Sequence, residues 1–330
     1  MLPLRTALAA LAAIAALSAC GTTETPAPAA SSTSGGTAPA TATPVTVTDA
    51  RGKPITLERA ASRVVSLEWG ETEMLASLGV MPVGAADVKG YATWVTAAPL
   101  DASVKDVGLR TEPSVDSIAS LQPDLVVMET DDEGLVAQVE KIAPVLVFKG
   151  SDATGNFQRM REEFKTLATA VGKTAEADKA LSDFDAALAD GKQKLAAAGV
   201  AGKPFAMADG WKEGSTISVR LFGKGALVSD VAEGLGLKNA WAGKVDKVWG
   251  LGNTDVEGLT ALKDADTRFF YSASDGVDVF ADGLASNAIW KSLPFVKKQG
   301  VTKLPDGIWT FGGPASCKQY AEALVKALTA

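Results

Sequence analysis

The chain has 330 residues, 47% of them hydrophobic, a formal net charge of -7 and no histidine. This composition provides enough apolar side chains for two ordinary domains, each with its own core. The acidic balance excludes the basic face that nucleic-acid binding requires, so no nucleic-acid partner is expected. The absence of histidine excludes metal coordination through imidazole and any Ser-His-Asp or Cys-His catalytic arrangement.

Residues 1–19 have the pattern of a signal peptide. Arg5 is followed by an apolar and small-residue run over 7–17, which is shorter than the roughly 20 residues of a membrane-spanning helix. Residues 17–21, at the end of this run, read Leu-Ser-Ala-Cys-Gly and resemble the bacterial lipobox. That resemblance implies that Cys20 carries a lipid and that the protein is extracytoplasmic and anchored to a membrane. A stray cysteine in an ordinary signal peptide is the alternative.

The segment 20–44 is expected to be a disordered tether, because it consists almost entirely of Thr, Ala, Pro, Ser and Gly. Cys317 is the only other cysteine. Lipidation of Cys20 would leave it without a disulfide partner, and it is expected to be a small buried residue at the start of the last helix.

An α/β lobe is predicted over 45–173, because short apolar strands alternate there with helical segments. It starts with a hairpin over 45–57 that turns at Asp49-Ala50-Arg51-Gly52. Strands are predicted at 63–68, 81–86, 124–129 and 145–148, and helices at 71–78, 114–121, 135–142 and 156–171. The acidic run at 131–133 lacks the ligand spacing of a calcium loop, so a solvated turn is expected there.

A single long helix is predicted over 174–198, where apolar residues recur at every third or fourth position; it would be roughly 40 Å long. It would connect the first lobe to a second α/β lobe over 199–330. Strands of that lobe are predicted at 204–208, 216–222 and 268–272, and helices at 227–235, 256–262, 287–298 and 314–328.

An internal repeat relates the two lobes. Residues 114–124 align with 255–266 with one inserted residue, and each copy is a short acid-bearing helix followed by an apolar strand. The repeat predicts lobes of similar construction, with Asp116 and Glu257 at equivalent places. A chance match of short amphipathic segments is the alternative.

Several segments resemble the siderophore-binding branch of the periplasmic binding proteins, in order over nearly the whole mature chain. They are 63–70, 78–84, 87–95, 107–113 with the first repeat copy, and 309–314. The resemblance implies two parallel-sheet, Rossmann-like lobes joined by one long α-helix, with ligand in a shallow cleft and little hinge closure. It also implies a binding protein, not an enzyme, that has no cofactor and delivers a ferric siderophore to an ABC import permease.

Within the family, the chain is most similar to binders of ferric hydroxamates. Without histidine, any iron is expected to arrive already chelated. Two alternatives stay open: haem or a corrinoid held in the same fold, and a lipid-anchored hydrolase, although the chain contains no nucleophile elbow, Walker loop or dinucleotide fingerprint. A monomer is expected.

Two arginines are candidate ligand contacts. Arg110 lies in a matched motif, and its planar guanidinium can donate hydrogen bonds to the iron-bound oxygens of a ferric hydroxamate. Arg220, on a predicted strand of the second lobe, can approach the same ligand from the opposite side, although a structural ion pair explains it equally well.

Aromatic residues are the second kind of candidate contact. Trp69, Trp94, Trp211 and Trp309 are predicted at strand ends or in loops, where ligand sites of α/β sheets lie. For each alone, core packing is as good an explanation, but the motifs favour Trp94 with Tyr91, and Trp309. The other tryptophans, Trp241, Trp249 and Trp290, lie outside the motifs.

Asp116 and Glu257 have a different role in the resemblance, since the family uses one acid on each lobe to engage arginines of the permease. The family usually has Glu in the first lobe, and Asp116 is one methylene shorter. An ordinary acid near a helix N-terminus is the alternative and is compatible with docking.

Overall fold

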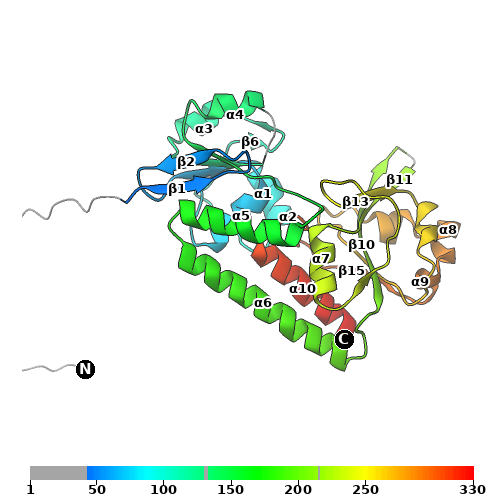
Figure 1. Cartoon of the computed structure of the whole chain (residues 1–330). Coiled ribbons are helices and arrows are strands. Elements are labelled where there is room, and N and C mark those ends of the chain that lie inside the picture. Colours follow the sequence, from blue (N-terminus) through cyan, green and yellow to red (C-terminus); the bar gives the residue numbers. More distant parts are fainter. Residues whose placement is uncertain (1–42, 130–132, 215) are drawn as a thin grey trace, which may run out of the picture. The chain divides into compact units, whose positions relative to one another are not determined.

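The computed structural model describes residues 43–129, 133–214 and 216–330, which belong to one compact unit (Figure 1). The predicted signal peptide, Cys20 and nearly all of the predicted tether lie outside these residues, as do Asp131 and Asp132. Among the described helices, none combines the length and the apolar character that a membrane crossing requires.

The described chain starts with the predicted hairpin of β1 (Val45–Thr48) and β2 (Pro54–Leu57), which pair antiparallel. Alternate side chains, among them Val47 and Ile55, are buried, which fixes the register of the pair. The Asp49 carboxylate accepts hydrogen bonds from the backbone N–H groups of Arg51 and Lys53 and so closes the turn.

The first lobe contains a five-stranded, wholly parallel sheet in the order β5-β4-β3-β8-β9. Its strands are β3 (Val64–Ser66), β4 (Gly84–Ala85), β5 (Lys105–Asp106), β8 (Leu125–Met128) and β9 (Val145–Val147). From β3, the next two strands, β4 and β5, lie on one side, and the later strands, β8 and β9, lie on the other side, so the chain changes direction across the sheet between β3 and β8. Ligands of such sheets bind beyond the carboxyl ends of the strands at this switch point, and the cleft described below lies there.

Four of the five helices of this lobe were predicted, and each helix starts after a strand or a short loop. They are α1 (Trp69–Ser77), α2 (Val88–Trp94), α3 (Val115–Ser120), α4 (Glu133–Val139) and α5 (Asn156–Ala170). The helix α2 was not predicted. It starts at Asp87, which has a left-handed backbone (φ 49°) and whose side chain accepts the Gly90 N–H.

The sheet of the second lobe is mixed, not parallel as predicted. Parallel pairing joins β10 (Pro204–Glu213) to β12 (Lys238–Asn239) and to β14 (Arg268–Tyr271), and joins β14 to β15 (Val301–Lys303). Antiparallel pairing joins β10 to β11 (Thr216–Phe222), and β11 to β13 (Leu251–Thr254). The physical reason is that β10 extends five residues beyond its predicted end and folds back into β11 as a hairpin.

Two predicted helices of the second lobe differ in the structure. In place of the helix at 256–262 there is a short 3-10 turn, η1 (Gly258–Ala261). The helix predicted at 287–298 is divided into α8 (Ala288–Ser292) and α9 (Pro294–Lys297), because Pro294 has no N–H to continue the hydrogen bonding. A π-helical turn, η2 (Val279–Gly283), and α7 (Leu227–Gly234) complete this lobe.

Two long helices link the lobes, and Figure 1 shows them side by side. The predicted connector is α6 (Thr174–Ala197), about 36 Å long at 1.5 Å per residue, and α10 (Pro314–Thr329) packs along it. A Cβ on Gly191 of α6 would lie 2.7 Å from Leu235 Cδ2 and 2.9 Å from Val325 Cγ2. Glycine therefore permits the close approach of α6 to these neighbours.

A buried carboxylate joins α1 to α10. Glu73 of α1 accepts hydrogen bonds from the N–H groups of Gly313, Ala315 and Ser316 at 2.7, 3.1 and 3.2 Å, at the N-terminus of α10. Burial raises the pKa of Glu73, and these hydrogen bonds oppose the rise. Cys317 is buried one turn later, as expected, and burial raises the pKa of its thiol.

The two repeat copies start alike, although the first continues as the α-helix α3 and the second as the 3-10 turn η1. The Ser114 hydroxyl accepts the Ser117 N–H at 3.2 Å, and at the aligned position the Asp255 carboxylate accepts the Gly258 N–H at 2.9 Å. The strand that follows the first copy, β8, pairs in parallel with β3. The strand that follows the second copy, β14, pairs in parallel with β10. The repeat thus reflects equivalent positions in the two lobes.

Candidate functional site

A cleft of about 550 Å³ is lined by residues of both lobes, close to the ends of the central strands. Its volume is in the usual range for a small-molecule site. The first lobe contributes residues that follow β3 and β8, and the second contributes residues of β10 and β11 and the residue after β14, Ser272. The segment before α10, Ile308 to Phe311, lines the cleft as well.

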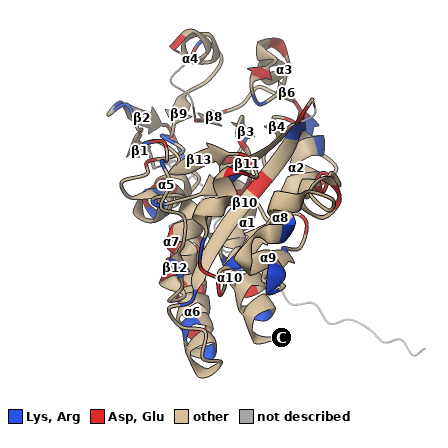
Figure 2. Cartoon of the chain, turned by 90° about the vertical axis from the view of Figure 1, so that its right-hand side faces the viewer, with Lys and Arg blue, Asp and Glu red and all other residues tan. Residues whose placement is uncertain are grey.

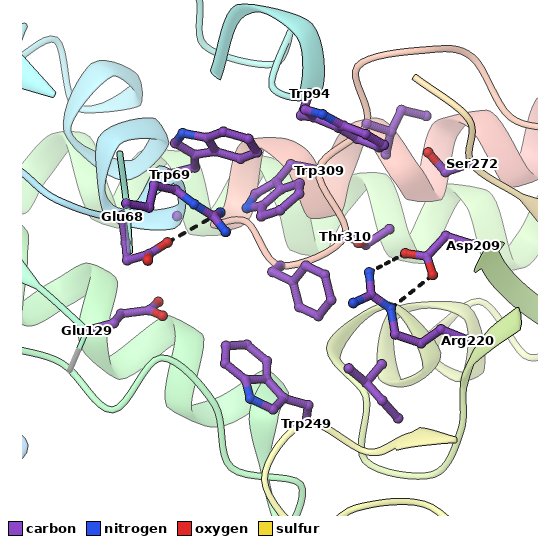
Figure 3. Close-up of a pocket in the computed structure, with 15 residues that line it drawn as sticks. Glu68, Trp69, Trp94, Glu129, Asp209, Arg220, Trp249, Ser272, Trp309 and Thr310 are labelled. Atoms are coloured by element: carbon purple, nitrogen blue, oxygen red, sulfur yellow. Dashed lines mark hydrogen bonds and ion pairs between the residues drawn. The ribbon is translucent and has the colours of Figure 1, made fainter. Parts of the chain in front are cut away.

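Aromatic rings form a continuous wall of the cleft. The Trp309 ring lies 4.9 Å from that of Trp69, 6.4 Å from that of Trp94 and 5.2 Å from that of Phe311, between centroids. Phe311 in turn lies 5.3 Å from the Trp249 ring. Figure 3 shows the indoles facing a common space. Such rings can cover apolar arms of a ligand while indole N–H groups remain available as donors.

Arg110 lies at the tip of the small hairpin of β6 (Gly108–Leu109) and β7 (Glu112–Pro113). Its guanidinium carbon is 4.1 Å from the centroid of the Trp69 ring and 5.5 Å from that of Trp309. One nitrogen lies 3.4 Å from a carboxylate oxygen of Glu68, which is an ion pair. These cation–π contacts hold the guanidinium in the cleft, and among the described residues Glu68 is its only ion-pair partner, so N–H donors remain available for a ligand.

Arg220 comes from the opposite lobe. It stands directly across from Asp209 in the β10–β11 pair, and two of its nitrogens donate to the Asp209 carboxylate, Nε at 2.9 Å. Its guanidinium carbon lies 5.3 Å from the Phe311 centroid. Burial raises the pKa of Asp209, and the arginine opposes the rise. The ion pair that the sequence left open is therefore present, and the guanidinium lines the cleft at the same time.

Two further carboxyl groups lie in the cleft, where the parallel sheet ends. Glu68 follows β3, and Glu129 follows β8 directly. Burial raises the pKa of Glu68, while Arg110 lowers it. Burial also raises the pKa of Glu129, to about 7. The charge of the cleft therefore changes near neutral pH.

Five of the seven predicted ligand residues line this cleft: Arg110, Trp69, Trp94, Arg220 and Trp309. Tyr91 does not, because it is 1% exposed and its hydroxyl donates to the Ala98 carbonyl at 2.6 Å, so the ring packs under Trp69 as core. Trp211 does not line it either. It is 39% exposed on β10, and its ring centroid lies 5.9 Å from the Arg220 guanidinium carbon.

Trp249, Glu129 and Asp209 also line the cleft, although none of them was predicted as a ligand contact. Trp249 is held by Asp246, whose carboxylate accepts the N–H groups of Trp249 at 2.6 Å and Leu251 at 2.9 Å. An aspartate that can accept the backbone N–H groups two and three residues later, followed by Gly250, is a turn signal that points to this loop. Asp209 has no such signal in the sequence. The strand was predicted to end at residue 208, one residue before it, whereas β10 continues to Glu213.

The cleft is built for recognition. Over residues 43–129, 133–214 and 216–330, no three or more Cys, Asp or Glu side chains are arranged to hold a metal ion. Two guanidinium groups, one from each lobe, and a wall of aromatic rings instead suit a bulky ligand with oxygen atoms at its centre and apolar arms.

Comparison with known proteins agrees with this geometry. The family model described as periplasmic binding protein matches residues 64–307. The iron(3+)-hydroxamate-binding protein FhuD of Escherichia coli (strain K12) is 27% identical over 270 residues, which are 81% of this chain and 87% of FhuD. The probable siderophore-binding lipoprotein YfiY of Bacillus subtilis (strain 168) is 29% identical over 293 residues, 83% of this chain and 84% of YfiY.

A solved structure extends the comparison to three dimensions. The Fe3+-Desferal-bound siderophore-binding protein FhuD of Vibrio cholerae superposes with a TM-score of 0.73 at 30% identity, covering 82% of this chain and 98% of that one. The family match over residues 64–307 and the structural likeness over 82% of the chain agree with each other. The chain belongs to the periplasmic binding protein family.

Proposed function

We propose that this protein captures a ferric siderophore of the hydroxamate type in the cleft between its lobes. The observation that carries the proposal is the pair of guanidinium groups, Arg110 from one lobe and Arg220 from the other, on an aromatic-walled cleft. The iron-bound oxygens of a ferric hydroxamate carry partial negative charge and accept hydrogen bonds from guanidinium donors. Relatives named for iron-hydroxamate binding support this ligand class.

We propose further that the protein hands its ligand to an ABC import permease, with Asp116 and Glu257 as docking acids. Asp116 lies in the first turn of α3, Glu257 precedes η1, and both side chains are exposed. Neither lines the cleft. Acidic side chains on equivalent parts of two lobes can meet two basic sites of a partner at once.

The N-terminal segment completes the proposal, although it lies outside the described residues. Residues 1–19 would direct export, and Cys20 would carry the lipid. The segment 20–44 would tether the folded part to the membrane. That part consists of the lobes 45–173 and 199–330 and the connector 174–198, and it would act as a monomer. A relative named as a lipoprotein supports an anchor of this kind.

A titration of tryptophan fluorescence tests the ligand class. Trp69, Trp94, Trp249 and Trp309 line the cleft, so a bound ferric hydroxamate should quench emission saturably, with a dissociation constant of about 1 µM or less, and iron-free chelator should bind more weakly. Ferric catecholates, haem and cobalamin are the comparison ligands. Saturable quenching by haem or cobalamin with none by any ferric hydroxamate contradicts the proposal, and turnover of the ligand would indicate a hydrolase instead.

A further inference from the structure

The charges that line the cleft do not balance. Three carboxyl groups, those of Glu68, Glu129 and Asp209, face two guanidinium groups. Arg110 pairs with Glu68 and Arg220 pairs with Asp209. Among the described residues, no Lys or Arg lies within ion-pair distance of Glu129, and Figure 3 shows no interaction between it and the other residues drawn. Among the described residues, Glu129 is therefore the one of these three acids without an ion-pair partner.

The structure holds the Glu129 carboxyl group firmly in this position. A Cβ on Gly150 would overlap its Oε2 atom, and Gly150 also has a left-handed backbone (φ +72°), so glycine is required beside the acid. Behind Glu129 lies Glu71 of α1, which is 1% exposed and hydrogen-bonded to it. Among the described residues, Glu71 Oε2 has no hydrogen-bond partner although it is buried.

Glu71 is the proton donor in the hydrogen bond between the two carboxyl groups. Burial and the neighbouring Glu129 raise the pKa of Glu71 well above its usual value, so Glu71 stays protonated and donates to Glu129. The other charged groups that face Glu129 are Glu68, Glu163 and Arg159. Arg159 lowers the pKa of Glu129 somewhat, but its ion pair is with Glu163 and it also donates to Asn156, so it acts on Glu129 only from beyond ion-pair distance.

We propose that Glu129, backed by Glu71, is a subsite for a positively charged group of the ligand, so that the protein prefers ferric complexes that carry a protonated amine. This inference rests on the proposed capture of ferric siderophores. A half-buried carboxylate without a counterion is costly, and an ammonium group supplies the missing charge. An anionic ferric complex would find both arginines already paired with carboxylates and would be repelled by the Glu129 carboxylate. The cleft would therefore bind anionic complexes less tightly than complexes with an ammonium group.

A matched pair of ligands tests the subsite. Fe3+-Desferal has a terminal amine that is protonated at neutral pH, and its N-acetylated form has the same iron centre without the charge. At about pH 8.5, where Glu129 is ionised, wild-type protein should bind the ammonium form at least about tenfold more tightly, or about 1.4 kcal/mol. In Glu129→Gln, the two forms should differ by less than about twofold.

Two controls accompany the pair. Glu58→Gln removes the same charge from an exposed position outside the cleft and should keep the full preference. The preference should also shrink as the pH falls through about 7, because protonated Glu129 no longer attracts the ammonium group.

The outcomes separate this inference from the proposed function. Tight and equal binding of both forms by wild-type protein overturns the subsite and leaves hydroxamate capture standing. An equal loss of affinity for both forms in Glu129→Gln also overturns it, because the residue would then only support the fold. If neither form binds, hydroxamate capture fails and the subsite fails with it.

Discussion

Arg110 illustrates how one side chain gains a function from its neighbours. The hairpin of β6 and β7 carries it to the cleft, and the Trp69 indole holds its guanidinium at 4.1 Å, while Glu68 supplies a counter-charge without a short hydrogen bond. Arg220, in contrast, uses two of its nitrogens to bind Asp209. Of the two arginines, Arg110 therefore has more donors available for a ligand.

We expect Arg110→Ala to weaken the binding of a ferric hydroxamate by about 1.5 to 3 kcal/mol, which is at least about tenfold in affinity, the usual scale for a hydrogen bond to a charged group. Arg110→Lys should restore only part of this affinity, since an ammonium keeps the charge but neither stacks on Trp69 nor donates in fork geometry. Fluorescence titration of the folded variants measures both effects.

The control for this prediction is Arg59→Ala, which removes an exposed arginine outside the cleft and should leave the affinity unchanged. Equal affinity of Arg110→Ala and wild-type protein would remove Arg110 from the site.

At this scale, the sequence predicted residues whose motif was recognisable and missed those whose position depends on tertiary structure. Arg110 and Trp309 lie in matched motifs, and both line the cleft. Tyr91 shares a motif with Trp94 but faces inward on α2, which no motif reveals because the helix itself was not predicted. Glu129 looked like an ordinary acid at the end of a strand, and its importance comes from Glu71 and Gly150, which are distant in sequence.

Elements were predictable where local periodicity was strong. The parallel strands of the first lobe read as short apolar runs because they are buried on both faces, and α6 showed a clear helical repeat. The antiparallel extension of β10 was not predictable, since residues beyond 208 are polar or exposed and gain their pairing only from β11. The direction of pairing in a sheet is a tertiary property.

The two acids of the internal repeat, Asp116 and Glu257, are expected to act in delivery of the ligand and not in its capture. Charge-reversing Asp116→Lys with Glu257→Lys should leave siderophore affinity within about twofold, because exposed charges outside the cleft are screened. Uptake through the partner permease should fall sharply, and further than with two alanines, because lysines would face the expected arginines. Affinity is measured on purified protein and uptake in complemented cells.

A matched control makes the same change of charge elsewhere. Asp178→Lys with Asp282→Lys alters two exposed acids, one on α6 and one on η2, and should leave uptake normal. Figure 2 shows acidic residues on α3, where Asp116 lies. Normal uptake by the Asp116 and Glu257 double variant would show that the repeat is only a feature of the fold.

The two lobes of the molecule are joined by more than the two long helices. Beside α6 and α10, hydrogen bonds cross between them: Asn156 Nδ2 donates to the Gly225 carbonyl at 2.7 Å, and Ser151 Oγ donates to the Val248 carbonyl at 2.8 Å. Near the cleft, the Thr96 N–H donates to the Gly307 carbonyl at 2.9 Å. These contacts support the small hinge closure that the family resemblance implied.

If a ferric complex binds between the lobes, the position of its iron atom is the most direct evidence. We would grow crystals with Fe3+-Desferal and collect anomalous diffraction at the iron absorption edge. One strong iron peak is expected inside the cleft, between the guanidinium groups of Arg110 and Arg220 and beside the Trp309 ring. An iron peak on any other surface, with the cleft free of chelator, would contradict binding between the lobes.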